Sequence, residues 1–241
     1  MRYLWLAATV LCACSAVAAE PEKEEEKPKF REHEVRNVEG WNVHVDKKLL
    51  EGEYAELGTW ALRVLSNQLF DISHRVPDDR VAKLREVPIY LDHDHPLRGM
   101  QYHPNVGWLR DNGHDPAMEK CVHIPESRRL IEHIRRYAQP SVVLHELAHA
   151  YHDRVLSFDE EEIRAAYKRA KEAKLYESVL HMRGTPQKHY ALTDHKEFFA
   201  EMTESFLGTN DFYPFVRGEL KECDEATFKL LEKIWLEKKD R

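Results

Sequence analysis

Cysteine is scarce in this sequence, and the few cysteines are poorly placed to hold a metal ion. The chain contains 4 cysteines, of which Cys121 and Cys223 lie beyond the N-terminal segment. No Cys-x-x-Cys pair occurs, so the sequence does not predict a thiolate zinc site. In an exported protein Cys121 and Cys223 are compatible with a disulfide and equally with two free thiols, and their spacing does not decide between them.

The sequence also lacks an excess of basic residues. It has 36 Lys and Arg against 43 Asp and Glu, which gives a formal net charge of -7. A surface that binds nucleic acid needs clustered positive charge, so this balance argues against nucleic acid as a partner. With 42% hydrophobic and 33% charged residues, the composition is that of a globular protein with a charged surface and a core.

A long hydrophobic run is missing as well. The apolar run at residues 4–17 is too short to predict a membrane span. Because Arg2 precedes it and small residues follow at 17–19, it is typical of a signal peptide over residues 1–19. The sequence therefore predicts export to the periplasm or the extracellular space. The alternative is a bacterial lipid-attachment motif at Cys14, which would anchor the protein at the cell envelope.

The segment after the signal peptide is highly charged. Residues 20–29 are almost entirely Glu, Lys and Pro. Such a segment cannot bury apolar surface, so we expect a disordered tether over residues 20–36. The rest of the chain has no internal repeat, and we predict a single domain over residues 37–241.

Hydrophobic periodicity in this domain predicts an α+β fold. Short alternating or apolar runs indicate strands at 41–45, 87–91 and 121–125, and apolar stripes indicate helices at 54–72, 80–85, 128–137, 159–181, 195–207 and 228–235. Residues 92–117, rich in Gly, Pro, Asn, Asp and His, are predicted to be a long irregular segment. We expect a small N-terminal sheet with helices, then a mainly helical half, with a cleft between them.

The central motif is His-Glu-x-x-His, which starts at His145 in an apolar, helix-favouring segment. Residues four apart on an α-helix project side by side, so His145 and His149 could bind one metal ion. Glu146 stands beside the same face and could reach a water on the metal. Ser141 is expected to cap this helix. The motif also occurs in helices that bind no metal, so its meaning depends on a third ligand.

A second predicted helix offers that ligand. Glu197 and Glu201 lie one turn apart in the segment EFFAE, on a helix expected to start after Asp194 and to stop at Gly208. Both carboxylates could therefore point at one place. The alternatives are a capping box between Asp194 and Glu197 and a surface position for Glu201. The surrounding aromatic residues demand burial, which argues against a purely solvated pair.

The combination of HELAH, a downstream EFFAE and Tyr190 at a fixed offset before Glu197 resembles the gluzincin zinc metallopeptidases. Within that group it is similar to the catalytic domain of anthrax lethal factor and to the Pro-Pro endopeptidases. The resemblance covers about residues 140–206. It implies a zincin-like fold, and it does not carry a substrate preference.

The resemblance also implies roles for individual residues. One zinc ion per chain would be bound by His145, His149 and Glu197. Glu146 would act as the general base, and Tyr190 would assist the reaction. Beyond these residues, Glu201 is expected to lie behind the site and to orient a ligand histidine or Tyr190.

Several other residues are weaker candidates. Asp153 and His152 could support the metal ligands, although surface positions are the preferred interpretation for both. The run Asp92-His93-Asp94-His95 looks like a metal-binding patch, although a solvated loop tip is the preferred interpretation. A strand edge near residues 121–124 could pair with an extended substrate. Residues 209–215 have no predicted role.

These observations predict a secreted zinc metallopeptidase that hydrolyses peptide bonds in a peptide or protein substrate. The first alternative is a non-catalytic, zinc-stabilised binding module of the cell envelope, in which His189 or His195 would complete the coordination. An intact Glu146 argues against it, because a structural zinc site needs no base. A metal-dependent hydrolase of a non-peptide amide is the second alternative, and nothing in the sequence separates it from a peptidase.

Overall fold

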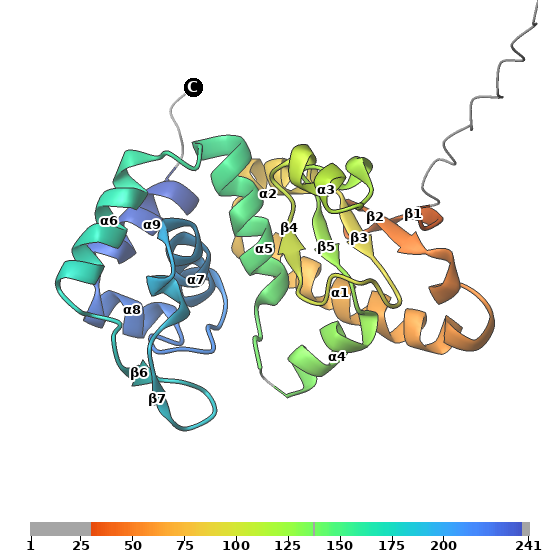
Figure 1. The fold of residues 1–241 in the computed structure, drawn as a ribbon. Coiled ribbons are helices and arrows are strands. Elements are labelled where there is room, and N and C mark those ends of the chain that lie inside the picture. Colours follow the sequence, from red (N-terminus) through yellow and green to blue (C-terminus); the bar gives the residue numbers. More distant parts are fainter. Residues whose placement is uncertain (1–29, 137, 238–241) are drawn as a thin grey trace, which may run out of the picture.

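The computed structural model describes residues 30–136 and 138–237, which form two halves on either side of helix α5 (Val142–Tyr151) (Figure 1). The sheet and the first four helices lie to the right of α5 in that view, and the later helices lie to its left. The fold is α+β, with a small N-terminal sheet followed by helices, as the sequence predicted. The predicted signal peptide, Cys14 and residues 20–29 of the tether lie outside the described residues.

The N-terminal half is built on a mixed sheet with the strand order β1-β2-β3-β5-β4. Its strands are β1 (His33–Val38), β2 (Trp41–Asp46), β3 (Ile89–Leu91), β4 (Gln101–Tyr102) and β5 (Val122–Ile124). The pairs β2–β3 and β3–β5 are parallel, whereas β1–β2 and β4–β5 are antiparallel. The sheet therefore ends at β4 on the side nearest α5 (Figure 1).

Strand β1 begins before the predicted start of the domain. It runs from His33 to Val38, so residues 33–36 belong to the sheet and not to the tether. Val35 on this strand is 54% exposed, so burial of apolar side chains does not explain why this segment forms a strand. The strand pairs with β2 along its whole length, from His33 opposite Asp46 to Val38 opposite Trp41. Backbone hydrogen bonding gives no hydrophobic signal, which is why the charge-rich sequence pointed to a tether.

Helices cover the sheet in the N-terminal half. They are α1 (Ala55–Arg75), α2 (Asp78–Arg85), α3 (Val106–Asp111) and α4 (Ser127–Arg135). The predicted stripe on α1 is buried at Ala61, Leu65, Leu69 and Ile72. The segment 92–117, predicted to be irregular, contains β4 and α3, which are too short to show a periodic pattern.

The C-terminal half is mainly helical. After α5, the chain makes a π-helical turn (His152–Leu156) and continues through α6 (Glu161–Glu172), the hairpin β6 (Val179–Leu180) and β7 (Pro186–Gln187), a 3-10 turn (Tyr190–Leu192), α7 (His195–Leu207), α8 (Arg217–Cys223) and α9 (Glu225–Trp235). The predicted helix over 159–181 is wrong in length. It stops at Glu172, and Lys174 takes a positive φ of 55° that turns the chain toward the hairpin.

The ends of α5 and α7 are tied together. Asp194 caps α7 as predicted, because its carboxylate accepts hydrogen bonds from the backbone N–H groups of Lys196 and Glu197. Ser141 does not cap α5 with its side chain. Its hydroxyl donates to the Thr209 carbonyl and accepts from the Thr209 N–H, both at 2.9 Å. A Cβ on Gly208 would lie 2.4 Å from Ser141 Oγ, so glycine permits this close approach.

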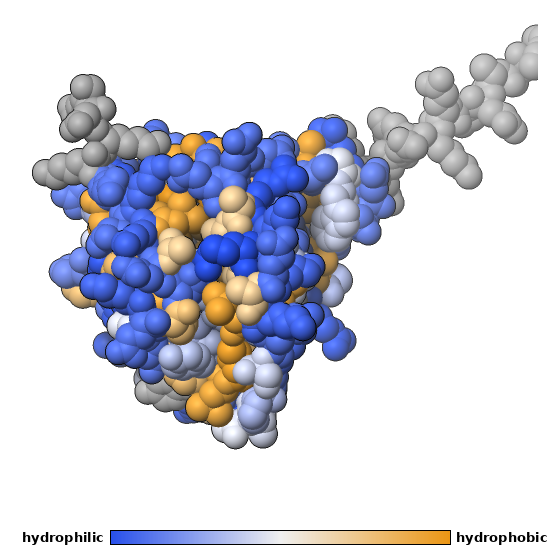
Figure 2. Space-filling view, turned by 90° about the vertical axis from the view of Figure 1, so that its left-hand side faces the viewer, coloured by the Kyte–Doolittle hydropathy of each residue, from blue (hydrophilic) through white to orange (hydrophobic). Residues whose placement is uncertain are grey.

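The surface and the thiols agree with the composition. The face of the helical half seen in Figure 2 is mainly hydrophilic, with a narrow strip of hydrophobic residues. Cys121 and Cys223 are both free thiols, and Cys121 is buried. None of the described helices combines the length and apolar character needed to cross a membrane.

Candidate metal centre

Side chains of α5 and α7 bring three potential metal ligands together. His145 Nε2 lies 3.1 Å from His149 Nε2 and 3.1 Å from Glu197 Oε2. The third side of this triangle, from His149 Nε2 to Glu197 Oε2, measures 3.3 Å. The two helices position these atoms because the histidines stand one turn apart on α5 and Glu197 occupies the first turn of α7. The structure thus brings the sequence-predicted ligands to one point.

The spacing of these atoms fits a four-coordinate ion. With zinc–ligand bonds of ~2.0–2.1 Å, a tetrahedral ion holds its ligand atoms about 3.3 Å apart. The observed sides of 3.1, 3.1 and 3.3 Å are close to that value. Two imidazoles and one carboxylate are also a common donor set for catalytic zinc, and they leave a fourth position free for a substrate or water. The geometry does not by itself identify the metal.

Two further carboxylates of α7 lie behind His145. Glu204 Oε1 is 2.7 Å from His145 Nδ1, and Glu201 Oε1 is 3.6 Å from the same nitrogen. Both glutamates are buried, so Glu201 does not occupy the surface position considered as an alternative. A carboxylate that accepts the Nδ1 proton fixes the tautomer in which Nε2 carries the lone pair. Glu204 therefore holds His145 in the orientation and tautomer that a metal ion would need, and Glu201 lies one turn before Glu204 on α7.

Asn210 holds Glu201 in this place. Its side-chain amide donates to Glu201 Oε2 at 3.0 Å and to the Glu201 carbonyl at 2.7 Å. Burial and the neighbouring Glu204 raise the pKa of Glu201 well above its ordinary value. Burial raises the pKa of Glu204 as well, but its hydrogen bond to His145 opposes that rise. Of the two carboxyl groups, Glu204 is therefore the one better placed to carry a charge facing His145. This gives residues 209–215 a role that the sequence did not indicate.

The charges of the ligands depend on one another. Burial opposes a charge on His145, but hydrogen bonds to Glu197 and Glu204 outweigh it, and the pKa of His145 is raised well above its ordinary value. Burial likewise opposes a charge on Glu197, yet hydrogen bonds to His145 and His149 lower its pKa. In the metal-free protein the site therefore carries a proton on His145 that a metal ion must displace.

Glu146 is fixed by the edge of the sheet. Its Oε2 accepts a hydrogen bond of 2.8 Å from the backbone N–H of Tyr102 on β4. The Tyr102 hydroxyl donates to Asp153 Oδ2 at 2.7 Å, and Lys120 forms an ion pair with the same carboxylate. Asp153 thus contacts Tyr102 and Lys120, and it reaches the centre only through the strand that holds Glu146.

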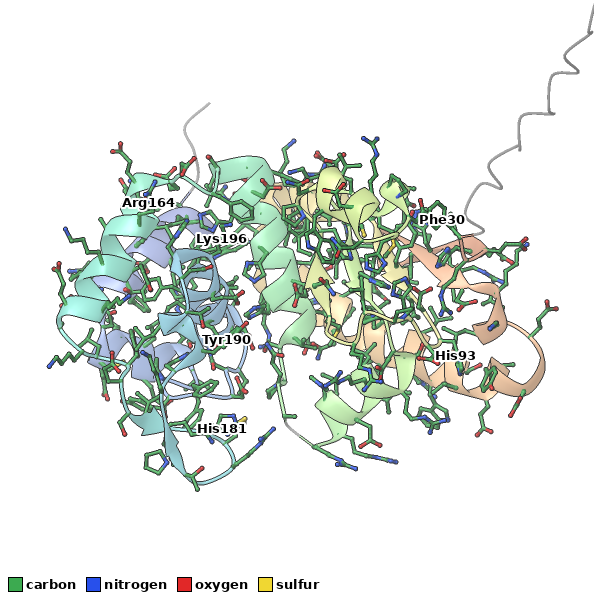
Figure 3. The ribbon with its side chains drawn as sticks, in the orientation of Figure 1. Phe30, His93, Arg164, His181, Tyr190 and Lys196 are labelled. Carbon is green, nitrogen blue, oxygen red and sulfur yellow. The ribbon has the colours of Figure 1, made fainter. Side chains whose placement is uncertain are left out.

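The centre opens into a cavity between the two halves. The cavity has a volume of about 540 Å³, and its walls include His145, Glu146, His149, Tyr190 and Glu197. Tyr190 and His181 lie on the C-terminal side of this opening (Figure 3). Tyr190 is 49% exposed, and burial together with the nearby Glu197 raises the pKa of its phenol. Its hydroxyl therefore stays protonated at neutral pH and can donate a hydrogen bond into the cavity.

Three other histidines point elsewhere. His195 Nε2 lies 2.7 Å from the Phe158 carbonyl, and His189 Nδ1 accepts from the Ala191 N–H. Among the described residues, neither His189 nor His195 joins the ligand group of His145, His149 and Glu197. His152 is fully buried against Phe158 and Phe199, so the expected surface position is wrong for this residue. The π-helical turn directs its ring inward.

The strand that borders the cavity is not the expected one. The predicted strand edge near 121–124 is β5, which is paired on both sides, with β3 and with β4. The edge of the sheet is β4, and Gln101 and Tyr102 of this strand line the cavity. Strand β4 has only the residues Gln101–Tyr102, which is too short for a hydrophobic pattern to reveal it.

Besides Asn210, sequence reasoning missed Glu204 and Tyr102. Glu204 was not singled out, although Glu197, Glu201 and Glu204 have the spacing of one helix face. The hydrogen bond from Tyr102 to Glu146 uses a backbone group and joins distant segments, so no sequence pattern could have indicated it.

Comparisons with family models, curated proteins and solved structures found no match for this chain.

Proposed function

We propose that this protein is a zinc-dependent endopeptidase with a zincin-like catalytic centre. The observation that carries the proposal is the convergence of His145, His149 and Glu197 at tetrahedral spacing on the wall of an open cavity. Two further features support it: Glu204 orients His145, and Glu146 lines the same cavity. A site that served only stability would have no use for an open position or an adjacent base.

The chain's own residues would divide the chemistry between them. A bound zinc ion would supply Lewis-acid activation of a water molecule and of the substrate carbonyl. Glu146 would accept a proton from the attacking water and pass it to the leaving amine. The Tyr190 hydroxyl would donate a hydrogen bond to the negative charge that develops on the carbonyl oxygen. The N–H of Tyr102 would keep the Glu146 carboxylate in place during these steps.

The shape of the cavity favours an extended peptide over a small amide. Its volume of about 540 Å³ is larger than the reacting bond requires, and strand β4 forms part of the wall. An extended chain could lie along this edge and use backbone groups other than the Tyr102 N–H, which is bound to Glu146. The export predicted from residues 1–19 would place such an activity in the periplasm or outside the cell, either free or lipid-anchored at Cys14.

Comparison of the wild type with Glu146→Gln tests this function. Both proteins are loaded with zinc and incubated with a diverse peptide mixture, and the cut sites are read by mass spectrometry. We expect the wild type to cut and the variant to lose about 10²–10⁴-fold in rate, because it lacks the base. Both should retain the zinc ion of this centre, because Glu146 is not a ligand.

Glu132→Gln on α4 is the matched control, since Glu132 pairs with Arg136 on the surface and lies outside the cavity. It should cut like the wild type. Cuts made equally by Glu146→Gln would exclude Glu146 as the base. The absence of cuts by all three proteins, with zinc bound, would instead favour the non-catalytic binding module.

A further inference from the structure

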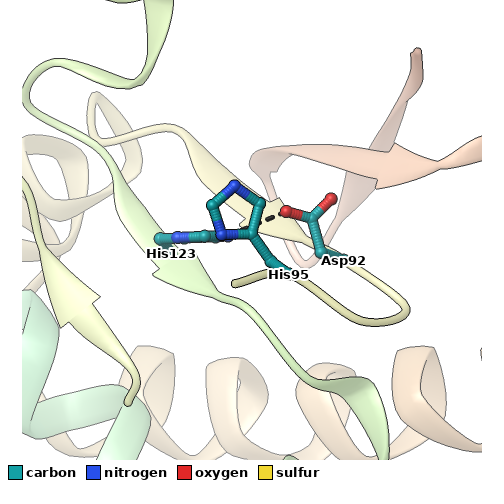
Figure 4. Close-up of side chains that lie close together, drawn as sticks. All are labelled: Asp92, His95 and His123. Carbon is teal, nitrogen blue, oxygen red and sulfur yellow. Dashed lines mark hydrogen bonds and ion pairs between the residues drawn. The ribbon is translucent and has the colours of Figure 1, made fainter. Parts of the chain in front are cut away.

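A second group of potential ligands lies in the other half of the molecule. Asp92 follows β3, His95 lies in the next loop, and His123 is the middle residue of β5. One ligand atom from each of these side chains lies within 4.8 Å of the others (Figure 4). Asp92 and His123 are 0% exposed, and His95 is half-buried. We propose that Asp92, His95 and His123 bind a divalent transition-metal ion, which ties the loop between β3 and β4 to the sheet.

The donor set of this group suits such an ion. Two imidazoles and a carboxylate bind first-row divalent metals, whereas calcium and magnesium prefer oxygen ligands alone. His123 Nε2 and Asp92 Oδ2 lie 2.8 Å apart, close to the spacing of about 2.9 Å expected around a six-coordinate ion with bonds of ~2.0–2.1 Å.

Residues outside the group form hydrogen bonds with two of the proposed ligands, as they do with metal ligands in known sites. His33 Nε2 lies 2.8 Å from Asp92 Oδ1, the oxygen that does not face His123. The second nitrogen of His123, Nδ1, lies 3.3 Å from His103 Nε2. Each buried ligand therefore has one atom directed toward the group and another held by a histidine outside it.

The group is also accessible to a metal ion from solvent. Asp92 and His95 form part of the wall of a cavity of about 810 Å³, together with His33, His114 and Asp115. The ring of His114 lies 5.5 Å from that of His95, and both residues line this cavity. A bound ion would thus have an entry path and room for water molecules as further ligands.

The position of the group suggests what the ion would do. The loop that carries His95 leads into β4, whose Tyr102 N–H holds Glu146. Glu146 lies beside the ligand group of His145, His149 and Glu197, which we call the α5–α7 centre. Met100 and Gln101, which precede Tyr102, line the cavity of that centre. An ion held by Asp92, His95 and His123 would fix the start of this loop against β3 and β5. The proposal does not rest on the proposed peptidase activity.

The competing explanation is a purely hydrogen-bonded cluster. Asp92 can accept hydrogen bonds from His33 and His123, and His95 Nδ1 can accept from the Leu97 N–H, without any metal. Both explanations make the residues buried and paired. They differ in whether the protein takes up an ion at this place and in what happens to that ion when His95 is removed.

Metal counting on the full chain tests the inference. The wild type and variants are equilibrated with Zn²⁺, desalted, and examined by native mass spectrometry and elemental analysis. We expect two zinc ions in the wild type, one bound by His145, His149 and Glu197 and one bound by Asp92, His95 and His123. His95→Ala and His149→Ala should each retain one ion. His93→Ala is the matched control, because His93 lies in the same loop as His95 but is not a member of the ligand group. The ring of His93 packs on Tyr54 instead, and the His93→Ala variant should retain both ions.

Each alternative outcome has a distinct meaning. An unchanged zinc content in His95→Ala, or a loss in His93→Ala, would overturn the inference. A single ion in the wild type that is lost in His149→Ala would overturn it too. A single ion that is lost in His95→Ala and kept in His149→Ala would support the inference and contradict the proposed function.

His95→Ala must be shown to fold, and a thermal shift provides that check. Without metal, its melting temperature should match that of His93→Ala. Added Zn²⁺ should raise the melting temperature of His149→Ala, since an ion bound only to the folded state stabilises it. The same addition should leave the double variant of His95→Ala and His149→Ala unchanged, and a shift of equal size in that variant would contradict the proposal.

Discussion

The two groups of potential ligands differ in their balance of charge. Around the α5–α7 centre carboxylates outnumber imidazoles, with Glu146, Glu197, Glu201 and Glu204 near His145 and His149. In the sheet the ratio is reversed, because Asp92 is surrounded by His33, His95 and His123, with His103 behind them. Even with the pKa values of Glu201 and His145 raised, the α5–α7 centre is the richer of the two in carboxylates, whereas Asp92 already has hydrogen-bond partners in His33 and His123. We therefore expect the α5–α7 centre to bind metal more tightly and to depend on it more strongly.

The two groups also differ in their surroundings. The α5–α7 centre combines its ligands with Glu146 and Tyr190 on the wall of one cavity. In the sheet, Asp92 and His123 are supported by other histidines, and neither a general base nor a tyrosine hydroxyl is paired with them in the described contacts. This contrast assigns chemistry to the first group and a structural role to the second.

Replacing Tyr190 with Phe tests the catalytic side of this contrast. We expect the turnover number for a cleaved peptide to fall by about 10²–10³-fold, the usual cost of losing one donor to a developing oxyanion. The metal content should not change, since Tyr190 is outside the ligand group. Tyr54→Phe, in the other half of the molecule, should behave like the wild type. Equal turnover in Tyr190→Phe and the wild type would remove this hydroxyl from the mechanism.

Replacing Glu204 with Gln tests whether a carboxylate behind the ligand strengthens the metal site. The change keeps the shape of the side chain but removes the charge that faces His145 Nδ1 at 2.7 Å. Zinc affinity at the α5–α7 centre should fall by about 10–100-fold, measured by competition with a chelator. Glu201→Gln should cost less, because Glu201 is farther from Nδ1 and its pKa is raised well above the ordinary value. The reverse order would show that Glu201 is the supporting carboxylate.

The metal affinity of the two groups should begin to fall at different pH values. The pKa of His145 is raised above its ordinary value of 6.5, so protons compete with metal at the α5–α7 centre before the pH has fallen to 6.5. Each proton displaced makes the affinity fall about tenfold per pH unit. The pKa of His95 is lowered to about 4, so protons compete at the sheet group only under more acidic conditions.

Zinc content followed against pH, in His95→Ala and in His149→Ala, measures the two groups separately. The ion of the α5–α7 centre, retained in His95→Ala, should lose affinity from the higher pH. The quantity to compare is the pH at which the zinc affinity of each group begins to fall. The order in which the ions leave is not informative, because the α5–α7 centre is expected to have the higher affinity. A common onset in both variants would contradict the assigned difference in protonation.

The same contrast explains how much of the candidate sites could be predicted from the sequence. His145, His149 and Glu197 lie on two helices, and helical spacing fixes which residues share a face. The sheet group joins Asp92 and His95 to His123, which depends on how β3 and β5 pair. The sequence pointed to the run 92–95 but preferred a solvated loop tip, and the burial of Asp92 shows that this preference was wrong for that residue.

For secondary structure too, local patterns could be predicted and features that depend on tertiary contacts could not. The long amphipathic helix α1 and the capped helix α7 were predicted close to their observed bounds, because their signals are local and repeated. The short strand β4 and helix α8 were not predicted, and α6 was predicted too long. These elements depend on tertiary contacts, which single-sequence periodicity does not contain.

The most direct test of the central claim is anomalous diffraction at the zinc edge from crystals of the zinc-loaded protein. The account predicts a strong anomalous peak bonded to His145 Nε2, His149 Nε2 and Glu197 Oε2, on the wall of the cavity that holds Glu146. It predicts a second, weaker peak among Asp92, His95 and His123. The absence of a peak between His145, His149 and Glu197 would contradict the assignment of that centre, whatever is found in the sheet.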